Sequence, residues 1–454
     1  MPRPPKATKP DEASKDAASF AIEASPSPPG STSVSPSGSA AGRRINDVEW
    51  ISSADALAAL GIRKESFYTY VSRGLIKSER KDGQKQRVYR KADVERLQTR
   101  AAARSGTPTV SRLLRYGEPI VQTWISEITP KGPRYRGYPA IDLVKERRSF
   151  EYVAELIWSG LPRPRDLPWP ALEQSIATDL VRVVHGGEPG KATALRFVGL
   201  ACAALSAMER GSSDDAGLSA TPTARHIVQV VAGISGLLGP KRRLSFPERG
   251  ERIAECVARG LGVRGQPDAV AAINAALVLS AEHELSAPTF TVRICASTGA
   301  DLFACVAAGV MAQSGPMQAG GTLDVEQLLA LAAQGGVDAA QELAGSALPC
   351  FGHPLYDRDP RAAYLLDVVK AADRRPKGSE GVWALIEAAE LSKQKPNIFA
   401  ALAVLGFSYE FPMGCSAYLH TLGRLVGWIA HATEQRLTGA MLRPRARYMG
   451  TPTP

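Results

Sequence analysis

The chain has 454 residues, of which 44% are hydrophobic and 22% charged, and these fractions are ordinary for a soluble globular protein with a large core. The longest apolar runs, such as the one at 302–312, are about half the ~20 residues that a membrane span needs, so no membrane association is expected. Six scattered cysteines without a CxxC pair, and an N-terminus without an apolar signal region, exclude a disulfide scaffold and a cysteine metal site and favour a reduced, cytoplasmic location.

Residues 1–45 are rich in Pro, Ser, Ala and Gly and contain almost no large apolar side chains. Such a segment cannot bury enough surface to offset the entropy lost on ordering. The sequence therefore predicts a disordered leader.

Residues 46–104 read as a compact basic unit. From 50 to 104 there are 13 Lys or Arg against 6 Asp or Glu, so this short segment carries +7 of the formal net charge of +10. A helix capped by Ser53, a second helix closed by Gly74, an Asp82-Gly83 turn between short extended runs and a final helix from Ala92 are expected. This is the order of a winged helix-turn-helix.

The unit resembles the MerR/excisionase type of DNA-binding domain over about 55 residues. The resemblance implies that the second helix and the wing contact DNA. The residues expected to do so are Arg63, Lys64, Tyr68, Arg73, Lys85 and Arg87. The alternative is a small basic domain that only docks on the rest of the chain.

Residues 115–454 begin with short extended pieces and continue as Ala- and Leu-rich segments with helical spacing, broken by Gly and Pro. The sequence predicts a mainly α domain. Eight motifs of this region resemble the citrate synthase family and stand in the family's order. They are YRGY (135–138), SFEYVAELIWSGLP (149–162), SAEHELSAPTFTVRICAST (280–298), SGP (314–316), FGHPLYDRDPRA (351–362), KPN (395–397), GRLVGWIAH (423–431) and RPRARYMG (443–450).

The resemblance implies a citrate synthase fold, with a large and a small helical domain, and a homodimer. It also implies C-acyl transfer from acetyl-CoA to oxaloacetate, with acyl-CoA as co-substrate and no covalently bound cofactor. In this chemistry a carboxylate removes a methyl proton, one histidine hydrogen-bonds to the thioester carbonyl, and a second faces the keto oxygen. Arginines and a further histidine bind the oxaloacetate carboxylates, for which guanidinium forks are well shaped.

The positions that bind the keto acid match the family. By resemblance, His283 binds oxaloacetate, His353 faces the keto oxygen, and Arg361 and Arg424 bind carboxylates. Arg443 matches the arginine that the partner subunit contributes to the site. No metal site is expected.

Two positions depart from the family. Gln318 stands where the family has its enol-forming histidine, and Phe399 stands where it has the general-base aspartate. A glutamine can still donate a hydrogen bond, whereas a phenylalanine accepts no proton. Efficient condensation by the usual route is therefore not expected.

Three hypotheses follow. The first is a carboxylate-binding, regulatory protein with weak or lost activity, which acts through the DNA-binding module. The second is an active citrate or 2-methylcitrate synthase of the tricarboxylic acid cycle type that uses a substitute base. The third is a partner subunit that forms a heterodimer with an active paralogue. The remaining histidines are expected to be core residues, and Asp357-Arg358-Asp359 a solvated turn.

Overall fold

The computed structural model describes residues 50–60, 64–72, 76–80, 87–91, 93–94, 121–172, 194–208, 220–344 and 348–444. The chain divides into two compact units, Met1–Thr109 and Val110–Pro454. The leader predicted at 1–45 lies outside the described residues.

The first unit contains two short helices and a three-stranded antiparallel sheet among its described residues. The elements are β1 (Trp50–Ile51), α1 (Ser53–Leu60), α2 (Lys64–Ser72), β2 (Ser78–Arg80) and β3 (Arg87–Arg90). The two expected helices and the paired extended runs are present. Strand β3 pairs with β2 on one side and with β1 on the other, so the sheet has one strand more than expected. The final helix predicted from Ala92 lies largely outside the described residues.

A small aromatic core holds the first unit together. Phe67 of α2 meets Tyr89 of β3 edge to face, with ring centroids 4.8 Å apart, and Ala56, Ile76 and Val94 are buried around them. The N-cap of α1 is Ser52, whose Oγ accepts the N–H of Asp55, so the cap predicted at Ser53 was wrong by one residue.

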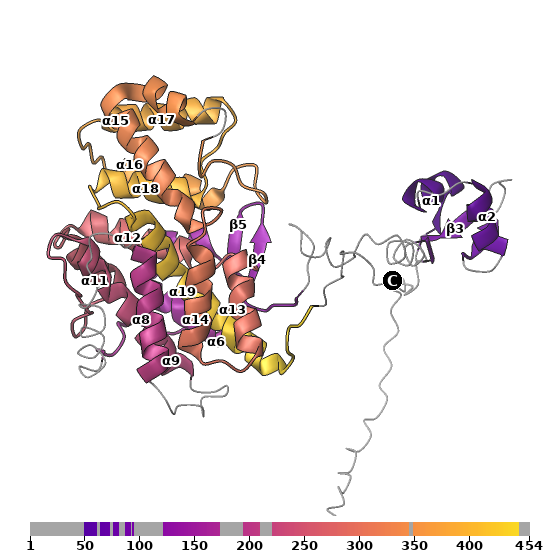
Figure 1. The fold of residues 1–454 in the computed structure, drawn as a ribbon, viewed down its shortest axis with the longest axis horizontal. Coiled ribbons are helices and arrows are strands. Elements are labelled where there is room, and N and C mark those ends of the chain that lie inside the picture. Colours follow the sequence, from indigo (N-terminus) through magenta and orange to yellow (C-terminus); the bar gives the residue numbers. More distant parts are fainter. Residues whose placement is uncertain are drawn as a thin grey trace, which may run out of the picture. The chain divides into compact units, whose positions relative to one another are not determined.

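The second unit opens with a three-stranded antiparallel meander and continues as helices (Figure 1). The strands are β4 (Ser126–Thr129), β5 (Gly132–Tyr135) and β6 (Tyr138–Pro139). The helices are α5 (Ala140–Lys145), α6 (Phe150–Ser159), α8 (Ala194–Met208), α9 (Ala220–Gly233), α10 (Ser235–Leu238), α11 (Ile253–Leu261), α12 (Pro267–Ser280), α13 (Ala287–Ser297), α14 (Leu302–Gln313), the 3₁₀ helix η1 (Ala319–Gly321), α15 (Thr322–Ala344), α16 (Pro360–Ala371), α17 (Ser379–Leu391), α18 (Ile398–Ser408) and α19 (Cys415–Thr438).

Helix α19 is the centre of the second unit. It packs against α6, α8, α9, α12, α13, α14 and α18, and almost all of its side chains are buried. A helix that is surrounded in this way can be apolar on every side, which explains the continuous apolar stretches of the sequence. Helices α15 to α18 gather at one end of the unit, as Figure 1 shows.

A close helix crossing positions the functional side of α19. A Cβ atom on Gly427 would lie 1.9 Å from Oε2 of Glu282, and the Gly427 N–H donates to the carbonyl of Ala281 at 3.0 Å. Only glycine permits this approach. The crossing brings Arg424, one turn earlier on α19, next to Glu282.

The mainly α architecture predicted for this region is therefore confirmed. In the described part of the chain, no helix combines the length and the apolar character needed to cross a membrane.

Candidate active site

Three aromatic rings, from two loops far apart in the sequence, lie at the centre of the candidate site. His283 follows α12, and His353 and Tyr356 lie in the loop before α16. The ring centroids of His283 and His353 are 5.2 Å apart, and those of His353 and Tyr356 are 4.7 Å apart. The hydroxyl of Tyr356 lies 3.2 Å from Nε2 of His283. The structure therefore brings together the two histidines that the sequence predicted as ligands.

Both histidines are uncharged near neutral pH. Burial, followed by the charge of Arg361, lowers the pKa of His353 to about 4. Burial, followed by Arg361 and Arg424, lowers the pKa of His283 well below its ordinary value. The N–H of Leu355 donates to Nδ1 of His353 at 3.1 Å, so the ring proton of His353 is on Nε2. His353 is thus set up as a neutral hydrogen-bond donor.

Arg361 is a buried cation held by the residue that begins its helix. Asp359 is the N-cap of α16, and its two carboxylate oxygens accept from Nε and Nη2 of Arg361 at 3.0 and 2.8 Å. The same carboxylate accepts the N–H of Ile398 at 3.1 Å, which ties the start of α18 to the site. The prediction of a solvated turn was wrong for Asp359, which is buried, although Asp357 is exposed.

Arg424 is held in the same way by Glu282. Its Nη1 lies 3.2 Å from Oε2 of Glu282, and its Nη2 donates to Oγ1 of Thr289 at 2.7 Å. Burial by itself would raise the pKa of Glu282, but the charge of Arg424 and the contact with His431 lower it to about 2. Arg361 and Arg424 therefore each pair with one buried carboxylate.

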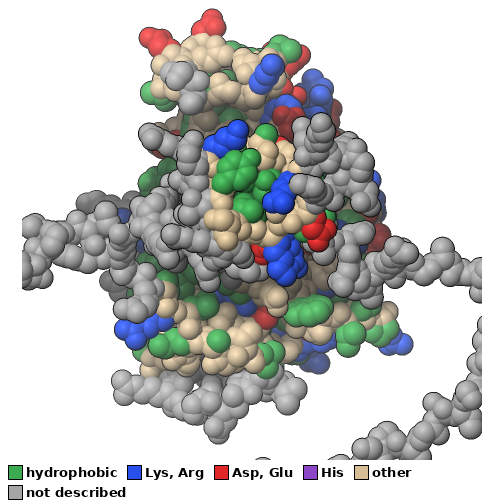
Figure 2. Space-filling view, turned by 90° about the vertical axis from the view of Figure 1, so that its right-hand side faces the viewer, with side chains coloured by type: hydrophobic (Ala, Val, Ile, Leu, Met, Phe, Trp, Pro, Cys, Tyr) green, Lys and Arg blue, Asp and Glu red, His purple; other side chains and the backbone are tan. Residues whose placement is uncertain are grey.

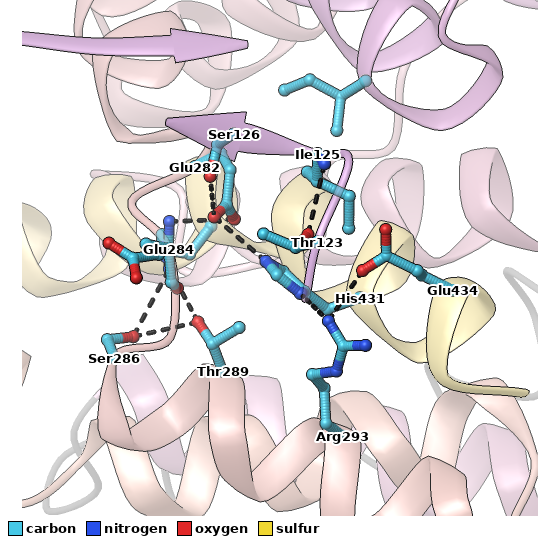
Figure 3. Close-up of polar contacts among 12 residues, drawn as sticks. Thr123, Ile125, Ser126, Glu282, Glu284, Ser286, Thr289, Arg293, His431 and Glu434 are labelled. Carbon is cyan, nitrogen blue, oxygen red and sulfur yellow. Dashed lines mark hydrogen bonds and ion pairs between the residues drawn. The ribbon is translucent and has the colours of Figure 1, made fainter. Parts of the chain in front are cut away.

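A polar network extends from Glu282 away from the site (Figure 3). Oε1 of Glu282 accepts from Ser126 at 3.0 Å and lies 3.1 Å from Nε2 of His431. Nη1 of Arg293 lies 3.0 Å from Nδ1 of His431 and 2.7 Å from Oε2 of Glu434. Because a guanidinium can only donate, His431 accepts through Nδ1 and donates through Nε2.

The network ends at the segment that precedes β4. The N–H of Trp124 donates to Oε1 of Glu434 at 2.8 Å. A continuous chain of contacts therefore joins Arg424 to the first described residues of the second unit.

Phe399, one of the two departures from the expected motifs, lies close to the segment that contains the other. Phe399 is the second residue of α18, and it packs against an apolar cluster that includes Ala319, the residue after Gln318. The ring centroid of Phe399 lies 4.5 Å from that of His420 on α19. An aromatic ring therefore lies at the position where the sequence comparison predicted a missing carboxylate.

The site combines two buried guanidinium groups with two neutral imidazoles, a set that suits a small dianionic keto acid. A family model described as "Citrate synthase, C-terminal domain" matches residues 113–445. The chain belongs to the citrate synthase family. Its citrate synthase fold is shared with solved structures, and the family needs no cofactor because acyl-CoA is a substrate.

Relatives support this assignment along most of the second unit. A Mycobacterium tuberculosis protein assigned by name as a second citrate synthase is 31% identical over 344 residues, which are 70% of this chain and 86% of that protein. Citrate synthase 2 of Bacillus subtilis is 29% identical and covers 72% of this chain and 92% of its own length. A citrate synthase of Thermoplasma acidophilum, solved with carboxymethyl coenzyme A and oxaloacetate, has a TM-score of 0.63 at 23% identity and covers 74% of this chain and 95% of its own.

The remaining predicted ligand is Arg443. It is exposed in the segment that follows α19. Its contribution to a partner subunit's site stays a prediction. No group of three or more His, Cys, Asp or Glu side chains within the described ranges is arranged to hold a metal ion.

The residues predicted to contact DNA are only partly described. Lys64 begins α2 and is exposed, Tyr68 is on the same helix with 46% of its surface exposed, and Arg87 begins β3 and is exposed. The predictions for Arg63, Arg73 and Lys85 lie outside the described residues. On the face drawn in Figure 2, Lys and Arg side chains (blue) lie among Asp and Glu side chains (red).

Sequence reasoning missed several residues of the site. Glu282 and Asp359 were not identified as the carboxylates that form ion pairs with the two buried arginines. The signal for Asp359 was the Asp-Pro pair at a helix start, which is a recognisable cap. The prediction that His420 is a core residue is confirmed, because it is buried and its Nδ1 lies 2.9 Å from Nε2 of Gln313. Its spacing of four residues from Arg424 on one helix also places both side chains on one face.

Proposed function

We propose that this protein binds a small di- or tricarboxylate, such as oxaloacetate or citrate, and condenses acyl-CoA with it weakly or not at all. The observation that carries the proposal is the contrast within one site. The two histidines and the two buried arginines that match the family's keto-acid ligands are held by hydrogen bonds and ion pairs, whereas Phe399, an aromatic residue, matches the family's general base.

Two buried carboxylates of the site, those of Glu282 and Asp359, are poor substitutes for that base. Glu282 is committed to Arg424, and its pKa of about 2 makes it a weak proton acceptor. Asp359 is bidentate to Arg361, which lowers its pKa against the opposing effect of burial. Loss of a positioned base typically removes about 10²–10⁴-fold in rate, and a weakened donor to the developing enolate removes roughly 10²–10³-fold more.

The test of binding is a calorimetric titration of the full chain with oxaloacetate and with citrate. We expect saturable binding that Arg361→Leu together with Arg424→Leu abolishes. Arg134→Leu, which removes an exposed arginine on β5, is the matched control and should leave the affinity unchanged. The absence of any binding at millimolar ligand would contradict the proposal.

The proposal extends to regulation through the first unit. A winged helix-turn-helix would place DNA occupancy under the control of the ligand if the two units communicate. The network from Arg424 through Glu282 and Arg293 to Trp124 supports this, because Trp124 lies in the segment that follows the first unit in the chain. A homodimer, in which Arg443 completes the partner's site, would present two modules to paired half-sites.

A second candidate is an active citrate or 2-methylcitrate synthase with a substitute base. Its support is the family itself, because a 2-methylcitrate synthase of Shewanella oneidensis is 33% identical over 192 residues, which are 39% of this chain and 50% of that protein. Thiol release from acetyl-CoA or propionyl-CoA in the presence of oxaloacetate would favour this candidate. A heterodimer with an active paralogue is a third candidate. It would be supported if the Arg443→Ala variant co-purifies with that paralogue and the mixed dimer is less active than the mixed dimer with the wild-type chain.

A further inference from the structure

His420 is a histidine of the site to which neither the sequence motifs nor the family comparison gives a role. It lies one turn before Arg424 on α19, and side chains four residues apart share one face of a helix. Only 6% of its surface is exposed, and its ring centroid is 4.5 Å from that of Phe399. The ring therefore lies between the arginine that matches a keto-acid ligand and the position of the lost base.

The protonation of the ring is set by Gln313, the buried last residue of α14. Its amide Nε2 lies 2.9 Å from Nδ1 of His420. Because an amide nitrogen only donates, Nδ1 accepts and the ring proton is on Nε2. Burial, followed by the charges of Arg424 and Arg361, lowers the pKa of His420 well below its ordinary value. His420 is consequently a neutral donor and a poor base, as neutral histidines that polarise carbonyl groups are.

The surroundings of the ring point to the acyl end of the site. Phe399 contacts the apolar cluster that contains Ala319, next to Gln318. By family resemblance these are the two positions whose side chains would act on the acetyl group. The keto-acid side, with His283, His353 and Tyr356, already has its donors.

Resting on the proposed function, we propose that Nε2–H of His420 donates a hydrogen bond to the carbonyl oxygen of an acyl thioester, or to a carboxylate oxygen of its analogue, in place of the histidine lost at Gln318. The site then still recognises the acyl group of acyl-CoA, although Phe399 cannot remove its proton. His420 is in this account a ligand-contacting residue for acyl-CoA and not a packing residue.

The test is a calorimetric titration of the full chain with carboxymethyl coenzyme A at saturating oxaloacetate. His420→Leu removes the donor and should weaken binding about three- to tenfold, the usual range for one neutral hydrogen bond. His420→Gln keeps a neutral N–H and should bind within about twofold of the wild type. His226→Gln makes the same chemical change on α9 and should leave binding unchanged.

A second variant tests the same hydrogen bond in case His420→Leu does not fold. Gln313→Leu has a similar volume and frees the ring to carry its proton on Nδ1, so it should also weaken binding of the analogue. The inference is overturned if the wild type binds no carboxymethyl coenzyme A, if His420→Gln is as weak as His420→Leu, or if a folded His420→Leu or Gln313→Leu binds as the wild type does. Oxaloacetate is titrated alone in each protein, so failure of the keto-acid site is seen separately.

Discussion

Arg361 and Arg424 are buried cations, and each is held by one buried carboxylate. That arrangement is costly unless the remaining donors of each guanidinium have a use, because burying a charge is expensive even when it is paired. In the proposed function, these two guanidinium groups and the neutral side chains of His283 and His353 together bind a dianion. Burial, followed by the charge of Arg361, lowers the pKa of both histidines and keeps them neutral.

The first prediction concerns the two substituted positions. Gln318→His together with Phe399→Asp should raise thiol release from acetyl-CoA by at least about 10²-fold, because a donor and a base return to neighbouring places. An aspartate at 399 would lie in the first turn of α18, where the helix dipole favours a negative charge. The measurement is thiol release at saturating oxaloacetate.

The control for this prediction is Gln318→His with Phe399→Asn, which has nearly the same shape and accepts no proton at neutral pH. Equal rates in the Asp and Asn variants would show that the base is not the missing group.

A second prediction uses the pH dependence of stability. The pKa of His353 is about 4 in the folded protein and about 6.5 when unfolded, so the unfolded chain binds the extra proton between these values. The stabilisation is therefore complete above about pH 6.5 and is lost as the pH falls toward 4. After allowance for solvent screening of a half-buried ring, about 1 kcal/mol should disappear between pH 7 and pH 5.

Urea unfolding of the wild type and of His353→Gln at both pH values measures this loss. The variant should lose about 1 kcal/mol less than the wild type over the same interval. An identical loss in the two proteins would mean that His353 is not buried as a neutral group.

Helix α19 positions Arg424. Its Gly427 lets the helix cross the end of α12 closely enough for Arg424 to reach Glu282. Gly427→Ala should therefore destabilise the protein by about 1–3 kcal/mol and weaken oxaloacetate binding, since the new Cβ displaces Glu282. Urea unfolding and calorimetry measure the two effects. The control is Gly439→Ala, at a position open to solvent after α19, which is expected to change only stability. If Gly427→Ala binds oxaloacetate with unaltered affinity, the helix crossing does not have this role.

At the level of elements, much of this architecture could be predicted. Caps, Gly and Pro breaks and helical spacing predicted the helices around 53–60 and 64–72 and the mainly α second unit. The third strand of the first unit could not be predicted, because Trp50–Ile51 is too short to show alternation. The pairing of Glu282 with Arg424 depends on tertiary contacts, as does the approach of His420 to Phe399. The pairing of Asp359 with Arg361 is local to the start of α16.

The molecule as a whole joins a basic N-terminal unit to a citrate synthase-family unit. If the first unit binds DNA, the logarithm of the affinity should fall linearly with the logarithm of the salt concentration. Lys64→Ala with Arg87→Ala should reduce the slope by about 2 if both contact phosphates, whereas Lys145→Ala on α5 should not change it. Fluorescence anisotropy with a short duplex measures the slope. No binding at low salt would leave the first unit without a nucleic-acid role.

The most direct test of the central claim is thiol release by the purified wild-type protein with oxaloacetate and acetyl-CoA or propionyl-CoA. The account predicts a rate at least about 10²-fold below an ordinary enzyme turnover of about 10 s⁻¹, in a protein that binds oxaloacetate. Turnover of 1 s⁻¹ or more with either thioester would contradict it, because such a rate requires a base that Phe399 cannot provide.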